Sequence, residues 1–196
     1  MGLSIHYSGQ IKFAASLPSL IEEVVDISKV HGWKYHIYET KFPNDTLDNQ
    51  LSFTPVYGIN FTPTESETIS LAFLSNGTMI CPARIRFFAD SKSEVERSYI
   101  FTNSVKTQYA GVVMHQLIIH ILKYLNGKYF ENFQLQDESH YWETEDENLM
   151  REQFKEYDKL IDNFALSIQT FPMNTGESLQ AYFNRMITHI NNLKKR

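Results

Sequence analysis

Cysteine is almost absent from this sequence of 196 residues, since Cys81 is its only thiol. A single cysteine excludes an intramolecular disulfide framework and a zinc cluster built on cysteines. Pro82 follows it, which places Cys81 at an edge or a break in a strand, and no local partner resembles a catalytic site. We therefore expect Cys81 to be a small buried hydrophobic residue.

Long hydrophobic runs and an excess of basic residues are also missing. No stretch approaches the length needed to span a membrane, and the N-terminal segment lacks the layout of a signal peptide. The net charge of −5 and the isoelectric point near 5.8 argue against nucleic acid or an anionic membrane as the main partner. The sequence thus predicts a cytoplasmic protein with no nucleic-acid and no membrane partner.

Signatures of catalysis and of cofactor binding are lacking as well. The sequence contains no glycine-rich phosphate loop, GxSxG elbow, dinucleotide fingerprint or EF-hand. No cofactor is indicated, and the balance favours a protein that is not an enzyme. Catalysis by another arrangement of residues stays open.

Aromatic residues are plentiful, and 14 Phe with 11 Tyr indicate thick packing or an aromatic-lined surface. Residues 104–127 contain the most apolar stretch, in which the end of a strand leads into a helix. His115, Gln116 and His120 form a narrow polar stripe on this helix, which indicates that a sheet and other helices cover most of its sides. Asn126-Gly127 predicts its end.

The first third of the chain has the pattern of strand, helix and strand. Alternating residues 3–9 predict the first strand, and the capping-box spacing at residues 19–22 predicts the start of a helix that ends at Gly32. Residues 33–39 predict the return strand. The Pro, Asn and Asp residues of 41–51 indicate a loop.

The middle of the chain has the pattern of antiparallel strands. Residues 56–61 and 69–73 predict two of them, and Asn76-Gly77 predicts a tight hairpin that returns through residues 78–81. Ile85 and Phe87 alternate with Arg84 and Arg86, which predicts a strand at 84–87, and residues 89–98 predict a polar loop. A further strand is predicted at 129–135, with Tyr129, Phe133 and Leu135 on one face.

The remainder is helical. The spacing of residues 144–147 is that of a capping box, and residues 149–168 place their apolar side chains on one face. Residues 171–176 form a break before the last helix, 179–193. The basic residues 194–196 suit the C-terminal end of that helix.

The predicted fold is α+β, with a mostly antiparallel twisted sheet, helices packed on one face and a C-terminal helical pair. The length favours a single domain over residues 1–196. In it, residues 1–140 form the α+β core, and residues 144–196 form the helical pair packed on that core.

Three strings of the sequence carry a resemblance. IHYSG at 5–9, SVKTQYAG at 104–111 and YWETEDENLMREQF at 141–154 resemble a group of uncharacterised bacterial proteins. The likeness covers most of the chain to about Phe164 and does not include the last helix. It implies a bacterial cytosolic origin and no particular activity.

The richest cluster of polar side chains follows the last predicted strand. Carboxylates and an imidazole are ligands for a divalent cation, and they would suit a metal-assisted hydrolase. The candidate metal ligands are Asp137, Glu138, His140 and Glu143. The alternative is that these acids precede a helix and interact with its dipole. His115 and His120 are about 140° apart on their helix, so they do not form a zinc pair and should hydrogen-bond to neighbouring groups.

The candidates for binding a small molecule are His6, Tyr7, His36, Tyr38, Lys106 and Gln108. The two His–Tyr pairs would form an imidazole–phenol face if their strands were neighbours. Lys106 and Gln108 precede the buried helix, whose N–H groups could receive an anion. The alternative is that all six are exposed or satisfied by structural hydrogen bonds.

Three hypotheses of function follow. The favoured one is a non-catalytic binding or interaction module that meets a protein partner or a second copy through its C-terminal helices. The second is an α+β pocket for a small molecule, lined by aromatics such as Tyr7, Trp33, Tyr38 and Tyr57. The third is the metal-assisted hydrolase.

Overall fold

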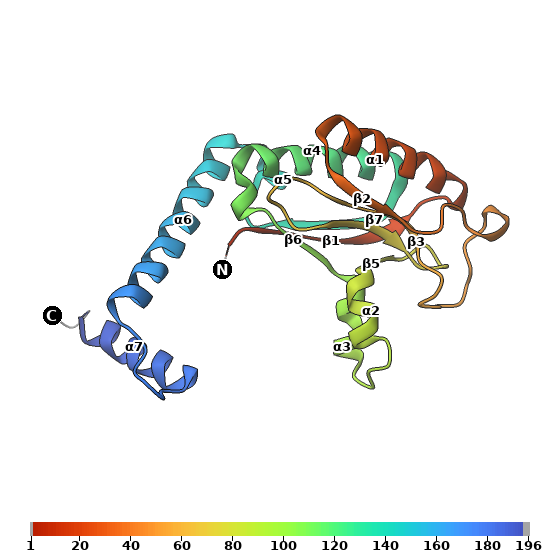
Figure 1. Cartoon of the computed structure of the whole chain (residues 1–196). Coiled ribbons are helices and arrows are strands. Elements are labelled where there is room, and N and C mark those ends of the chain that lie inside the picture. The colour runs from red at the N-terminus through yellow and green to blue at the C-terminus, as the bar shows by residue number, and fades with distance from the viewer. Residues whose placement is uncertain (1, 194–196) are drawn as a thin grey trace. The chain divides into compact units, whose positions relative to one another are not determined.

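The computed structural model describes residues 2–193 and has an α+β fold with two antiparallel sheets. Figure 1 shows α1 (Leu17–His31) and α4 (Gly111–Tyr129) on one side of the sheets, and α2 (Pro82–Phe88) with α3 (Glu94–Ser98) on the other. No helix among the described residues is long and apolar enough to cross a membrane. The predicted fold class is confirmed.

One sheet has three strands in the order β6 (Asn103–Lys106), β1 (Ser4–Ile11) and β7 (Phe130–Asp137). Along β1, Ile5 and Tyr7 are buried, whereas His6 and Ser8 are only half-buried. Because side chains alternate between the faces of a strand, one face of this sheet is covered and the other is open and polar. The apolar side of α4, with Ile118, Leu122 and Leu125, is part of the buried core.

The other sheet has four strands in the order β2 (Lys34–Ile37), β3 (Tyr57–Thr62), β4 (Ile69–Phe73) and β5 (Met79–Ile80). The hairpin predicted at Asn76-Gly77 joins β4 to β5. Its turn is closed by hydrogen bonds from the Leu74 N–H to the Thr78 carbonyl (3.0 Å) and from the Gly77 N–H to the Leu74 carbonyl (2.9 Å). Gly77 has φ +79°, the left-handed conformation that glycine adopts most easily.

The two sheets meet along a seam where β1 and β6 of one sheet contact β5 and β4 of the other. At one end the Ile11 N–H donates to the Gly77 carbonyl (2.9 Å), and at the other the Lys106 N–H donates to a Glu67 carboxylate oxygen (2.8 Å). Between them the Tyr7 hydroxyl accepts from the Ser70 N–H (2.9 Å) and donates to the Ser70 carbonyl (3.0 Å). A side chain thus satisfies the backbone groups that strand pairing leaves open.

Two segments differ from the sequence prediction in type. Residues 84–87, predicted as a strand, lie in α2, and part of the predicted loop 89–98 forms α3, whose N-cap Ser93 accepts from the Glu96 N–H. In α2, Ile85 and Phe88 pack against a buried cluster that includes Ile80 and Ile100. Their spacing of three residues is helical, so tertiary packing overrides the local alternation.

Element ends also differ. α1 begins at Leu17 with Pro18 in its first turn, so the capping box predicted at residues 19–22 is wrong, whereas the end at Gly32 (φ +68°) is confirmed. α4 does not stop at Gly127 but runs to Tyr129, and β7 starts only at Phe130. Tyr129, predicted on a strand, is therefore helical and buried.

The C-terminal region contains α5 (Tyr141–Thr144), α6 (Glu147–Thr170) and α7 (Leu179–Leu193), which confirms two long helices separated by a break. The chain divides into two compact units, one of residues 2–154 and one that begins at Lys155. The boundary between them therefore falls inside α6. A single domain with the helical pair packed on the core stays a prediction. The basic residues 194–196 lie outside the described residues.

Candidate functional site

A fully buried polar cluster links α4 to the end of β7. The His115 Nε2 atom lies 2.8 Å from the Ser139 hydroxyl and 3.1 Å from the Asp137 Oδ1 atom, while its Nδ1 atom lies 2.6 Å from the Thr107 hydroxyl. The Ser139 hydroxyl also donates to Asp137 Oδ2 (2.8 Å). All four residues are buried, and the side chains of His115 and Asp137 have no exposed surface.

This cluster contains the residue types of a hydrolytic triad, but its hydroxyl groups are closed to solvent. Asp137 and Ser139 meet the same nitrogen of His115, and the Thr107 hydroxyl on the other nitrogen is fully buried, so no substrate reaches either hydroxyl in this structure. Burial opposes the ionisation of Asp137, but hydrogen bonds from His115 and Ser139 and the attraction of the imidazole outweigh it and lower the pKa of this carboxyl. The arrangement is that of a structural junction.

The four candidate metal ligands have different environments. Asp137 belongs to the buried cluster and also accepts from the Ser139 and Trp142 N–H groups, and Glu138 accepts from the Ser4 N–H (2.7 Å). His140 directly precedes α5 and Glu143 lies within it, and both are exposed. Within residues 2–193 no three His, Cys, Asp or Glu side chains are arranged to hold a metal ion, so the metal hypothesis has no geometric support.

The predicted polar stripe of α4 is hydrogen-bonded as expected, but to side chains that follow β7. The Gln116 amide donates to the Tyr141 hydroxyl (2.7 Å) and to Glu147 (3.0 Å). His120 Nε2 lies 3.2 Å from the same Tyr141 hydroxyl. The stripe therefore attaches α4 to the segment that leads into α6.

The candidate ligand residues of the three-stranded sheet separate into exposed and structural ones. His6 lies on the open face, 3.9 Å from Glu138, beside Gln134 and Gln136 in a shallow depression of about 390 Å³. Sequence reasoning missed these two glutamines, because register alone brings them opposite His6 and Ser8. Tyr7 serves the seam between the sheets instead.

Lys106 and Gln108 make hydrogen bonds at the strand-to-helix corner. The Lys106 N–H is bonded to Glu67, at the end of β6. Gln108 is buried, and its side-chain oxygen accepts from the Leu3 N–H (3.0 Å). These two bonds fit the structural alternative, and an anion site at the start of α4 stays a prediction.

His36 lies on β2 of the other sheet and Tyr38 directly follows that strand, so the hypothesis that their strand neighbours β1 is wrong. Among the described strands, β2 pairs with β3 alone. The rings of His36 and Tyr38 meet edge to face, with centroids 4.7 Å apart. Tyr38 accepts from the Asn60 amide (3.0 Å). A shallow depression of about 290 Å³ lies here. Neither Trp33 nor Tyr57 lines it, so these predicted aromatic residues do not share this depression with Tyr38.

The two C-terminal helices carry matching apolar stripes. One stripe is Leu160, Phe164 and Ile168 on α6, and the other is Leu179, Phe183 and Ile187 on α7. Each has the order Leu, Phe, Ile at intervals of four residues, which places its members on one helix face. All six residues expose between 37% and 65% of their surface.

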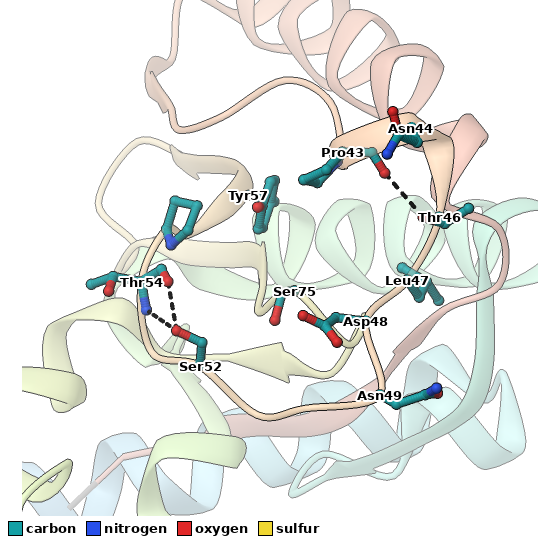
Figure 2. A pocket seen from close by; sticks show the side chains of 11 residues that line it. Pro43, Asn44, Thr46, Leu47, Asp48, Asn49, Ser52, Thr54, Tyr57 and Ser75 are labelled. Atoms are coloured by element: carbon teal, nitrogen blue, oxygen red, sulfur yellow. Dashed lines mark hydrogen bonds between the residues drawn. The ribbon is translucent and has the colours of Figure 1, made fainter.

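A cavity of about 510 Å³, which we call the loop cavity, lies inside the long connection between β2 and β3 (Figure 2). It is lined by residues of the segment 43–55 together with Tyr57 and Ser75. Sequence reasoning identified a loop at 41–51 but no site in it. The only signal was its density of Asn, Asp, Ser, Thr and Pro, which also marks ordinary loops.

Comparisons with protein-family models, with curated proteins and with solved structures give no match for this chain. The resemblance of its sequence strings to bacterial proteins therefore stays a prediction.

Proposed function

We propose that this protein is a non-catalytic, cytoplasmic interaction module that pairs with a second copy of itself through α6 and α7. The observation that carries the proposal is the pair of exposed Leu–Phe–Ile stripes on these helices. Apolar side chains at helical spacing that remain in water favour association, because their burial is worth about 25 cal/mol per Å².

The size of the C-terminal unit favours a partner. In the part of it that the structure describes, Tyr182 and Met186 are the buried apolar residues of α7, while both stripes are exposed. A helical pair of about 40 residues rarely buries enough apolar surface to be stable alone. Association with another such pair would supply the missing core as a four-helix bundle.

A second copy fits these stripes better than an unrelated partner. In a two-fold dimer the same patch serves both subunits, so a patch must complement itself. Two stripes with the same residues in the same order and spacing meet that condition.

The turn between the helices is ordered by Arg185. Its guanidinium donates to both carboxylate oxygens of Glu177 (2.9 and 2.7 Å) and to the Pro172 carbonyl (2.9 Å), and it lies 4.2 Å from the ring centroid of Phe171. The Arg185 hydrogen bonds lower the pKa of Glu177 to about 2. A preordered turn reduces the entropy that association must overcome.

Sedimentation over a range of protein concentrations tests this proposal. We expect a reversible dimer, and we expect Phe164→Glu with Phe183→Glu to raise its dissociation constant more than about thirtyfold, as for central interface residues. Val113→Glu is the matched control, because Val113 is an exposed apolar residue of α4. A monomer at every concentration, or equal dissociation constants for the double variant and the control, would contradict the proposal.

A further inference from the structure

The lining of the loop cavity is polar but nearly uncharged. It includes hydroxyl and amide side chains, two prolines, one leucine and one tyrosine. Among the described residues, Asp48 is its only carboxylate, and no Lys, Arg or His side chain lines it. A site without cationic side chains does not attract an anion, and hydroxyl and amide groups both donate and accept hydrogen bonds. The chemistry fits a neutral ligand with several hydroxyl groups.

Tyr57 provides an ordered hydroxyl at this cavity. Its residue surface is only 3% exposed, and its ring stacks on Phe42 with centroids 4.4 Å apart. No group within residues 2–193 hydrogen-bonds to the Tyr57 hydroxyl. Burial, and then the charges of Glu39 and Asp48, raise the pKa of Tyr57, so the hydroxyl keeps its proton and remains a donor.

Asp48 provides a matching acceptor. Its Oδ1 atom accepts from the Gln50 N–H (3.1 Å), which fixes the turn and leaves Oδ2 for another donor. Figure 2 shows the Asp48 carboxylate beside Ser75, with Tyr57 and Ser52 on other sides of the cavity. A buried donor and a carboxylate acceptor are the groups that orient a hydroxylated ring.

The loop is held open by specific contacts. The Asp48 N–H donates to the Ser75 carbonyl (2.9 Å), and the Ser75 hydroxyl donates to the Gln50 carbonyl (3.2 Å). Leu47 packs over the hairpin at Gly77, where an added Cβ would come within 2.9 Å of the Leu47 side chain. Because the loop is tied to a β-hairpin, the cavity exists before any ligand arrives, which reduces the entropy lost on binding.

We propose that the loop cavity binds a small neutral saccharide. The C–H face of a sugar ring would pack against Pro43 and Pro55, while its hydroxyl groups donate to Asp48 and accept from the Tyr57 hydroxyl. A volume of about 510 Å³ lies within the usual range of small-molecule sites. The site lies within residues 43–75 and does not depend on the pairing of α6 with α7.

Saturation-transfer NMR on the full chain tests this proposal with four probes: glucose, galactose, N-acetylglucosamine and cellobiose. We expect transfer to the ring protons of at least one probe, followed by a calorimetric titration with that sugar. Tyr57→Phe removes one hydroxyl and keeps the ring, so it should raise the dissociation constant about tenfold, as should Asp48→Asn. Tyr99→Phe is the matched control, because Tyr99 is an exposed tyrosine away from the cavity.

Two results would overturn the proposal. One is the absence of transfer to all four sugars, and a calcium titration that then perturbs the amide signals of residues 44–49 would make Asp48 a cation ligand instead. The other is binding that neither Tyr57→Phe nor Asp48→Asn weakens relative to the control. Asp48 is exposed on the loop, so Asp48→Asn remains informative even if Tyr57→Phe fails to fold.

Discussion

At the scale of single residues, the buried cluster of His115, Asp137 and Ser139 holds polar side chains fully out of water. Removing a charged group from water costs several kcal/mol, and only good hydrogen bonds offset it. Asp137 receives them from His115, from the Ser139 hydroxyl and from two backbone N–H groups. Loss of any partner therefore leaves a buried group unsatisfied.

Because the pKa of Asp137 is lowered in the folded protein, its contribution to the free energy of unfolding depends on pH. Because the unfolded carboxyl binds a proton more readily, the contribution is complete above the unfolded pKa of about 3.9 and is lost as the pH falls through the lower folded value. We expect Asp137→Asn to lower the free energy of unfolding at pH 7 by about 3 kcal/mol. We also expect the variant to lose less stability than the wild type as the pH falls from about 5 to about 3.

Urea denaturation at several pH values measures both effects. Hydrogen bonds from Arg185 lower the pKa of Glu177, and a hydrogen bond from Lys123 lowers that of Glu145. These two groups contribute to acid destabilisation in both proteins, so the difference between the two pH profiles isolates Asp137. Parallel profiles for variant and wild type would show that Asp137 is not preferentially ionised in the folded state.

These residues also show what the sequence leaves undetermined. Asp137 was a candidate metal ligand and His115 part of a polar stripe, yet they meet because β7 returns antiparallel to β1 and ends beside α4. Tyr7 was a candidate ligand residue, and its hydroxyl instead completes the seam at Ser70. Both contacts join residues more than twenty positions apart, and no local pattern encodes such a distance.

At the scale of elements, strong local signals predicted the structure well. A glycine in the left-handed conformation explains both the turn at Asn76-Gly77 and the end of α1 at Gly32. A nearly continuous apolar surface explains the long helix α4. The segment Arg84–Phe87 carried no such signal. Four alternating residues fit a strand, but Arg84 donates to the Tyr99 and Thr102 carbonyls and stabilises a helix.

The start of α6 gives a prediction at this scale. The sequence pointed to Thr144 as the N-cap, but the Asp146 carboxylate accepts from the N–H groups of Asn148 (2.8 Å) and Leu149 (3.1 Å). A lost N-cap costs about 1 kcal/mol. We therefore expect Asp146→Ala to lower the free energy of unfolding in urea by that amount and Thr144→Ala by less. The reverse order would place the cap at Thr144.

At the scale of the whole molecule, the boundary after residue 154 separates two units that differ in how many side chains they bury. The unit of residues 2–154 contains the two sheets and most of the buried apolar side chains. The unit that begins at Lys155 has few buried side chains among its described residues. Local opening in the second unit should therefore cost less free energy than opening of β3 and β4.

This difference makes the proposed pairing visible by amide hydrogen exchange. A partner that binds only the folded helices stabilises them by mass action, so the protection of residues 160–187 should rise with protein concentration. The protection of β3 and β4, whose core does not depend on a second copy, should stay constant. Phe164→Glu with Phe183→Glu should abolish the concentration dependence and leave the sheets unchanged. Protection of residues 160–187 that is already high and independent of concentration would mean that the helices are covered within one chain, as in the predicted packing of the helical pair on the core.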